Sequence, residues 1–221
     1  MDFTALGLTL RLATFTTLLL ILIATPLAAW IAGGSSVPRR IAQAAVALPL
    51  VLPPTVLGFY LLVGLGPTTA VGRTLITLIG HPLAFTFPGL LLGSMVYSLP
   101  FAVQPLVVAF ASIDRPTIEV ARVLGASPWT VFRKITLPLS RMSFVTAAVL
   151  TFAHTVGEFG VVLMIGGDIP GVTRTLSISI FDDVQELRYT DANVTAAALV
   201  ALSFLALLLI YSRGHRRSEL V

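Results

Sequence analysis

Apolar residues occur in long runs that contain no charge. Four such runs hold no Asp, Glu, Lys or Arg, and they cover residues 12–38, 41–72, 74–113 and 192–212. A fifth apolar run, residues 142–167, holds one charge, Glu158. Each run is long enough for a membrane-spanning helix, because about 20 residues that rise about 1.5 Å each cross a hydrocarbon core of about 30 Å.

We therefore predict an all-α, polytopic membrane protein with about five transmembrane helices. The predicted spans are residues 8–32, 41–65, 88–110, 142–165 and 192–211. They form the core, about 8–211, of one membrane domain that covers residues 1–221. Between the second and third spans, residues 66–87 hold only a short apolar piece, which cannot cross a bilayer. We expect an outer loop with a helix at the interface there, and a re-entrant hairpin is the alternative.

Composition agrees with a membrane protein. The chain is 56% hydrophobic and 11% charged, whereas soluble domains carry about 25% charged residues. The absence of cysteine excludes a disulfide framework, a thiolate metal site and a cysteine nucleophile. The first apolar run is too long for a signal peptide and has no early Lys or Arg, so we expect a retained helix.

Basic residues predict the orientation. With five spans and a cytoplasmic carboxyl end, ten of the fourteen Lys and Arg residues lie on the inner side, and only Arg11, Arg73, Arg174 and Arg188 lie outside. The positive-inside rule then places the amino end outside and the carboxyl end in the cytoplasm. The net charge of +4 therefore reflects topology rather than a nucleic-acid partner.

The outer segment 166–190 is rich in acidic residues. It contains Asp168, Asp182, Asp183 and Glu186. Unpaired carboxylates avoid hydrocarbon, so we expect a solvated loop.

Two features within the spans are candidates for a translocation path or gate. Pro53-Pro54 removes two backbone donors in succession and is expected to bend the second span. Packing alone is the alternative explanation for such residues. A bent helix beside a path would suit gating, by analogy with the broken helices of transporters. The candidate residues are Pro53, Pro54, Gly58, His154, Gly157, Glu158 and Gly160.

Glu158 is the one charge in its predicted span. A charged residue at this depth costs roughly 3 kcal/mol and faces protein or water. His154 lies one helical turn earlier and is expected on the same face. Three roles remain open for Glu158: a structural hydrogen bond, gating of a path, and a proton relay. Because a carboxylate is a poor ligand for a dianion, we do not assign Glu158 to cargo binding.

The inner segment 111–140 predicts two short helices at an angle. Asp114 is expected to cap the first helix, and Gly125 is expected to end it. Ser127 is expected to cap the second helix, which ends at Leu137-Pro138. A DNA-binding helix-turn-helix is the alternative, but both ends run into membrane spans and leave no free recognition helix.

The same segment resembles the E-A-A…G…I-x-L-P loop of ABC importer permeases. Glu119-Val120-Ala121, Gly125, Ile135 and Leu137-Pro138 stand at its spacing, with Val120 in place of the middle alanine. The resemblance implies a type I importer permease fold, and it implies that this loop docks into a cleft of a cytoplasmic ATPase. The residues it assigns to coupling are Glu119, Ala121, Arg122, Gly125, Ala126, Ser127, Leu137 and Pro138.

Other segments are similar to the molybdate permease branch of the binding-protein-dependent inner membrane components. They are residues 48–58, Val156-Gly157-Glu158-Phe159-Gly160 and residues 168–176, and the resemblance covers most of residues 38–180. His154 stands where molybdate permeases often have arginine. The resemblance implies import of molybdate across a bacterial or archaeal cytoplasmic membrane, with sulfate or tungstate as alternative cargo.

The chain itself contains no nucleotide-binding motif. Residues 66–74 imitate a phosphate loop, but the glycine spacing is wrong and Arg73 replaces the lysine. We therefore expect a non-enzymatic subunit without a cofactor or metal. The expected partners are a second copy, two ATPase subunits, an extracytoplasmic molybdate-binding protein and the lipid bilayer, with no nucleic acid. A proton-coupled anion transporter using His154 and Glu158 is the rival function, and a membrane-anchored DNA regulator is a second.

Overall fold

The computed structural model describes residues 2–214, and this part of the chain contains helices and no strand. The all-α prediction is confirmed. The α-helices are α1 (Phe3–Ala32), α2 (Val37–Ala47), α3 (Pro54–Gly64), α4 (Ala70–Ile79), α5 (Phe87–Ala111), α6 (Arg115–Val123), α7 (Pro128–Val131), α8 (Leu137–Leu139), α9 (Arg141–Gly157), α10 (Gly160–Gly166), α11 (Leu176–Gln185) and α12 (Tyr189–Gly214). A 3-10 turn covers Leu48–Leu50, and a π-helical turn covers Phe132–Thr136.

Three of these helices, α1, α5 and α12, are long and apolar enough to cross a membrane. Two bent pairs pass the same test, so the described residues contain up to five spans if each pair counts as one. The first pair joins Val37–Leu50 to Pro54–Gly64 at 112°, and the second joins Pro128–Leu139 to Arg141–Gly157 at 71°. The number agrees with the prediction, but two of the five spans are broken.

The predicted second span, residues 41–65, bends sharply. Helix α2 ends at Ala47, and α3 begins at Pro54 after the 3-10 turn. Pro53 and Pro54 offer no N–H groups to continue the helical hydrogen bonds of α2, and Pro53 has the extended ψ of 135°. The predicted bend at this Pro-Pro step is confirmed.

The predicted fourth span, residues 142–165, is not one helix. Helix α9 ends at Gly157, Glu158 is extended with φ −67° and ψ 133°, and α10 starts at Gly160. The prediction that His154 and Glu158 share one helical face is therefore wrong, because Glu158 lies beyond the helix end. Glycines on both sides of the break weaken helix propensity there.

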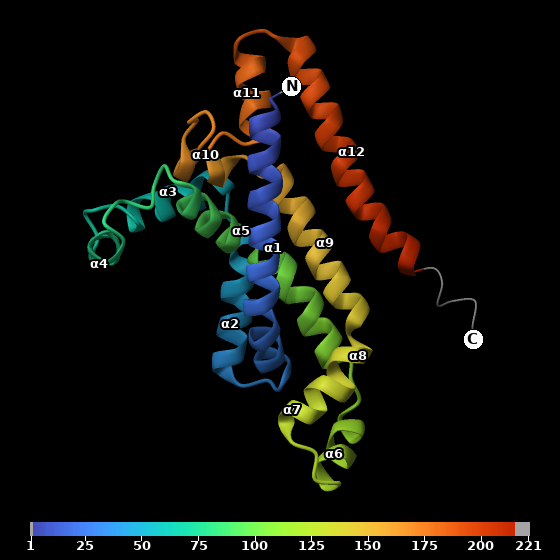
Figure 1. The fold of residues 1–221 in the computed structure, drawn as a ribbon. Helices are drawn as coiled ribbons and strands as arrows, with labels where there is room; N and C mark the ends of the chain where they lie inside the picture. The colour runs from blue at the N-terminus through green and yellow to red at the C-terminus, as the bar shows by residue number, and fades with distance from the viewer. Residues whose placement is uncertain (1, 215–221) are drawn as a thin grey trace.

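The core is formed where α1, α5 and α9 pack together (Figure 1). Alanines at the contact let the helices approach closely, as is common in membrane helix pairs. Buried members of this cluster include Leu20, Ala24, Ala28, Ala102, Leu106 and Ala147. Helix α12 packs against α9 and α11, while α3 and α4 extend to one side of the bundle (Figure 1).

The two ends of the bundle carry different elements. The amino terminus and α11 lie at one end, and α6 and α7 project from the other (Figure 1). Residues 166–190 were predicted to be a solvated loop, but they contain α11, with Leu176 and Ile178 buried. That prediction is wrong for α11 because its apolar side chains pack inward while its acidic side chains are paired.

The connection between α3 and α5 contains the expected short helix, α4. The hydroxyl of Thr69 accepts a hydrogen bond from the Gly72 N–H at 3.0 Å, and Gly80 ends the helix with φ 88°. Its position at a membrane interface stays a prediction.

Candidate functional site: a helical hairpin and a pocket at a helix break

The α6–α7 hairpin folds through its local sequence. Gly125 has a φ of 82° and its N–H donates to the Arg122 carbonyl at 2.9 Å, so it ends α6 as predicted. The Ser127 hydroxyl accepts from the Thr130 N–H at 3.2 Å and caps α7. Asp114 occupies the cap position of α6, but its side chain makes no capping bond. The second helical stretch continues through the π-helical turn to Leu139, one residue beyond Pro138.

The tip of the hairpin exposes large apolar side chains. Val123 is 87% exposed, Leu124 is 81% exposed and Trp129 is 67% exposed. A cluster of exposed apolar side chains on a projecting element is typical of a protein-binding surface. Sequence reasoning missed these three residues, although a Val-Leu pair directly before a helix-ending glycine is a usable signal.

Two charged residues of α6 lie beside a cavity at the base of the hairpin. Glu119 and Arg122 line a cavity of about 490 Å³ between the hairpin and the ends of α1 and α5. Ala121, Gly125, Ala126 and Ser127 lie on the hairpin itself. Leu137 and Pro138 lie in α8, at its base, before the 71° bend. The structure therefore places the predicted coupling residues on α6, in the turn that leads to α7 and in α8 at the base of the hairpin, and their contacts with an ATPase stay a prediction.

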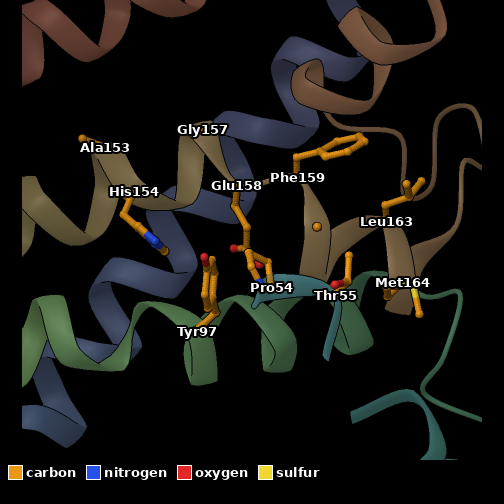
Figure 2. Close-up of a pocket in the computed structure, with 11 residues that line it drawn as sticks. Pro54, Thr55, Tyr97, Ala153, His154, Gly157, Glu158, Phe159, Leu163 and Met164 are labelled. Atoms are coloured by element: carbon orange, nitrogen blue, oxygen red, sulfur yellow. The ribbon is translucent and has the colours of Figure 1, made fainter. Parts of the chain in front are cut away.

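A second cavity, of about 560 Å³, opens at the break between α9 and α10 (Figure 2). We call it the break pocket. Its lining residues are Pro54, Thr55, Tyr97, Ala153, His154, Gly157, Glu158, Phe159, Gly160, Leu163 and Met164. Five of the seven predicted path residues meet here: Pro54, His154, Gly157, Glu158 and Gly160. Pro53 and Gly58 are not among the lining residues.

Glycines hold α3 tightly against α10. A Cβ at Gly58 would lie 2.7 Å from the Met164 Cβ, and a Cβ at Gly160 would lie 2.7 Å from the Pro54 Cβ. Neither position accepts a side chain without moving a neighbour. The Pro53-Pro54 bend is therefore packed directly onto the segment that follows Glu158.

Glu158 and His154 have different surroundings in the break pocket. Glu158 is only 4% exposed, and the buried Ser94 hydroxyl of α5 faces its carboxylate, but neither carboxylate oxygen makes a regular hydrogen bond among the described residues. His154 bonds the Ser98 hydroxyl at 2.9 Å and stacks on Phe101 with ring centres 4.1 Å apart. Buried polar groups are usually hydrogen-bonded, so the Glu158 carboxylate is an exception in this fold. His154, in contrast, is held by residues of α5.

The end of the bundle that contains the amino terminus carries a cluster of ionised side chains. We use the name acid–arginine cluster for Asp168, Arg174 and Asp182. Arg174 donates to Asp168 from both Nε and Nη2, the latter at 2.8 Å, and its Nη2 lies 3.6 Å from Asp182. The hydrogen bonds from Arg174 lower the pKa of Asp168. Burial, with the neighbouring Asp168, raises the pKa of Asp182 to about 6.

Helices long and apolar enough to cross a membrane, two of them bent pairs, define the class of this chain as a polytopic membrane protein. The chain belongs to the family of binding-protein-dependent transport system inner membrane components, whose family model matches residues 8–219. It is therefore a multi-pass protein of the inner membrane, and the family resemblance inferred from the loop motif is confirmed.

Two molybdenum permease relatives match nearly the whole chain, and a sulfate permease relative matches about four fifths of it. It is 52% identical over 219 residues to the molybdenum transport system permease protein ModB of Azotobacter vinelandii, covering 99% of this chain and 97% of that one. It is 35% identical to a putative molybdenum transport system permease protein, YvgM, of Bacillus subtilis, over 96% and 93% of the two chains. A probable sulfate transport system permease protein of Chlorella vulgaris is 33% identical, over 78% of this chain and 64% of that one.

The fold also matches a solved structure. A chain of the bacterial alginate ABC transporter, crystallised with an alginate pentasaccharide-bound periplasmic protein, superposes with a TM-score of 0.76. The match covers 97% of this chain and 78% of that one, at 21% identity. It shows a shared fold with an ABC transporter membrane subunit, as the loop motif predicted.

Proposed function

We propose that this chain is the permease subunit of an ATP-driven importer that carries molybdate across the cytoplasmic membrane. The observation that carries the proposal is the 52% identity, over 99% of the chain, to a molybdenum transport permease. The sulfate-related chain is more distant, at 33% identity over 78%. Molybdate is therefore favoured over sulfate, and tungstate shares its tetrahedral dianion chemistry.

The proposed assembly contains two copies of the chain and two ATPase subunits. ATP hydrolysis takes place in those separate subunits, and this chain carries no cofactor. The exposed side chains of Val123, Leu124 and Trp129 support docking of an ATPase at the hairpin tip. An extracytoplasmic binding protein then delivers the anion at the opposite end, where α11 and the acid–arginine cluster lie (Figure 1). This orientation puts the amino end outside and the carboxyl end in the cytoplasm.

The break pocket forms part of the gate in this proposal. Its walls come from α3, α5, α9 and α10, and the close contacts at Gly58 and Gly160 join the α2–α3 bend to the α9–α10 break. Alternating access requires an element with two arrangements, and broken helices at mid-membrane commonly supply it in transporters. The role of Glu158 is then to respond to a change in this pocket rather than to bind the dianion.

Uptake by proteoliposomes tests the proposal. The vesicles contain this chain with its ATPase and binding protein, and labelled molybdate and sulfate are offered separately. We expect uptake that needs internal ATP and the loaded binding protein, with molybdate preferred and tungstate competing. If uptake survives an inactive ATPase but collapses when the proton gradient is dissipated, the chain is a proton-coupled transporter instead. Preferred sulfate uptake would overturn the cargo assignment alone.

A further inference from the structure

Helix α11 holds the backbone at the α9–α10 break. The Ser177 hydroxyl donates a hydrogen bond to the backbone carbonyl of Glu158, 19 residues earlier in the chain. Four residues further along α11, the ring of Phe181 packs against Phe159 with centres 5.1 Å apart. One side of a ten-residue helix therefore contacts both residues of the break.

The side chains of the two break residues point in different directions. The Glu158 side chain points toward Tyr97 and Pro54, whereas the Phe159 ring, which also lines the break pocket, extends to another side (Figure 2). Because Phe159 and the Glu158 carbonyl are held by α11, the direction of the Glu158 side chain depends on the position of α11. The carboxylate itself makes no regular hydrogen bond among the described residues, and the buried Ser94 hydroxyl of α5 is the polar group that faces it.

Helix α11 also makes polar contacts toward the end of the bundle that contains the amino terminus. Arg174 ties Asp168 in the preceding loop to Asp182 on α11. The Leu176 N–H, at the start of α11, donates to the Thr9 hydroxyl of α1 at 2.9 Å. Helix α11 thus bridges the surface where a binding protein would dock and the break that carries Glu158.

We propose that Ser177 is a positioning residue for Glu158, and that α11 transmits the docking of the binding protein from the acid–arginine cluster to the break pocket. This inference rests on the proposed function, because it assigns a role within the gate. A purely structural hydrogen bond would also satisfy the carbonyl left unpaired where α9 ends. The two roles predict different effects when the Ser177 hydroxyl is removed. A positioning role lowers only the stimulation of ATPase activity by the binding protein, whereas a structural role lowers basal and stimulated activity equally.

The test compares Ser177→Ala with Ser177→Thr, which keeps a hydroxyl donor, in the reconstituted complex. Ser179→Ala is the matched control, because Ser179 is a buried serine on the same helix with no side-chain hydrogen bond among the described residues. Basal ATPase activity, its maximal stimulation by the loaded binding protein and the half-maximal concentration of that protein are measured.

A second measurement reports on the break pocket. The chain has no cysteine, so Thr55→Cys adds a single thiol to the pocket wall. The Ser177 variants are made again in the Thr55→Cys chain, and the rate at which this thiol is labelled is compared among them.

We expect Ser177→Ala to lower maximal stimulation about tenfold, the effect of one hydrogen bond. Basal activity and the half-maximal concentration should stay within about twofold, because the hairpin and the docking surface are unchanged. Ser177→Thr should restore stimulation, and the labelling of Thr55→Cys should respond to the binding protein in Ser177→Thr but not in Ser177→Ala.

The inference is overturned if Ser177→Ala behaves like Ser179→Ala, or if Ser177→Thr fails to restore stimulation. Equal loss of basal and stimulated activity would show a structural role only and would also overturn it. If Ser177→Ala does not assemble, Phe181→Leu serves as the second variant, because it weakens the contact of α11 with Phe159 through a half-exposed ring. Stimulation should then fall several-fold, and unchanged stimulation overturns the inference. Failure of the unsubstituted complex to take up molybdate contradicts the proposed function instead.

Discussion

The α6–α7 hairpin and the break pocket place side chains in opposite kinds of unfavourable surroundings. At the hairpin tip, Val123 and Leu124 are more than 80% exposed on a projecting element. In the break pocket, the carboxylate of Glu158 is buried without a hydrogen-bond partner among the described residues. Exposed apolar surface favours a permanent or frequent contact with another protein. A buried, unpaired carboxylate costs free energy, so it favours a second conformation in which the carboxylate is hydrated or hydrogen-bonded. The comparison predicts that hairpin variants fail in assembly and that pocket variants fail in transport.

The largest effect is expected at the hairpin tip. Leu124→Asp places a charge where the proposed ATPase contact needs an apolar side chain, and loss of such a central contact costs about 2–4 kcal/mol, or about 30-fold to 1,000-fold in affinity. ATPase binding to the detergent-solubilised chain should weaken accordingly, and uptake should be lost. Leu124→Met is the matched control and should bind normally.

A second hairpin variant tests its geometry rather than its surface. Gly125→Val puts a β-branched residue at a φ of 82°, where open space surrounds the position but the backbone conformation is costly. The ATPase should bind more weakly while the chain still inserts in the membrane. Normal ATPase binding by both Leu124→Asp and Gly125→Val would show that the hairpin is not the coupling element.

An intermediate effect is expected in the break pocket, and it separates stability from transport. Glu158→Leu removes a buried carboxylate that makes no regular hydrogen bond and has only the Ser94 hydroxyl facing it, so the free energy of unfolding should stay the same or rise by about 1–3 kcal/mol. Uptake should fall at least tenfold, because the pocket loses its polar group. Glu158→Gln keeps the size and the hydrogen-bonding capacity and should transport within a few-fold of the unsubstituted chain.

Thermal melting in detergent and uptake in proteoliposomes measure the two effects. A strongly destabilised Glu158→Leu would reveal a structural partner for the carboxylate. Equal loss of uptake in Glu158→Leu and Glu158→Gln, at normal membrane levels, would show that the negative charge itself is required.

The hairpin could be predicted from the sequence because its determinants are local. Gly125 and Ser127 end and start helices through bonds to residues at most four positions away. The five apolar runs were equally readable, since span length depends on composition alone. The Pro53-Pro54 bend followed from two missing N–H groups.

The break at Glu158 could not be predicted in this way. Membrane helices often contain glycine, so Gly157 and Gly160 do not by themselves end a span. The extended conformation of Glu158 is accompanied by the bond from Ser177, which lies in a separate helix. Helix α11 was missed for a similar reason, because four acidic residues indicated a solvated loop while Arg174 and Arg188 pair with all of them in the fold.

The smallest effect is expected in the acid–arginine cluster, which neither the hairpin nor the pocket contains. Burial and the neighbouring Asp168 raise the pKa of Asp182 to about 6, above its usual value near 4. The folded chain therefore binds this proton more tightly than the unfolded chain, so the stability contribution of Asp182 is greatest below pH 4 and declines as the pH rises to about 6. Asp182→Asn removes the titration and should make melting less dependent on pH in this window. Because the side chain is 23% exposed, the difference should be only about 1–3 °C in melting temperature.

Asp168→Asn is the opposing control. Arg174 lowers the pKa of Asp168, so loss of the Asp168 carboxylate should destabilise the chain at neutral pH and progressively less below pH 4. If the melting temperatures of the unsubstituted chain and Asp182→Asn change equally with pH between pH 4 and 7, Asp182 does not titrate in this window and the prediction is wrong.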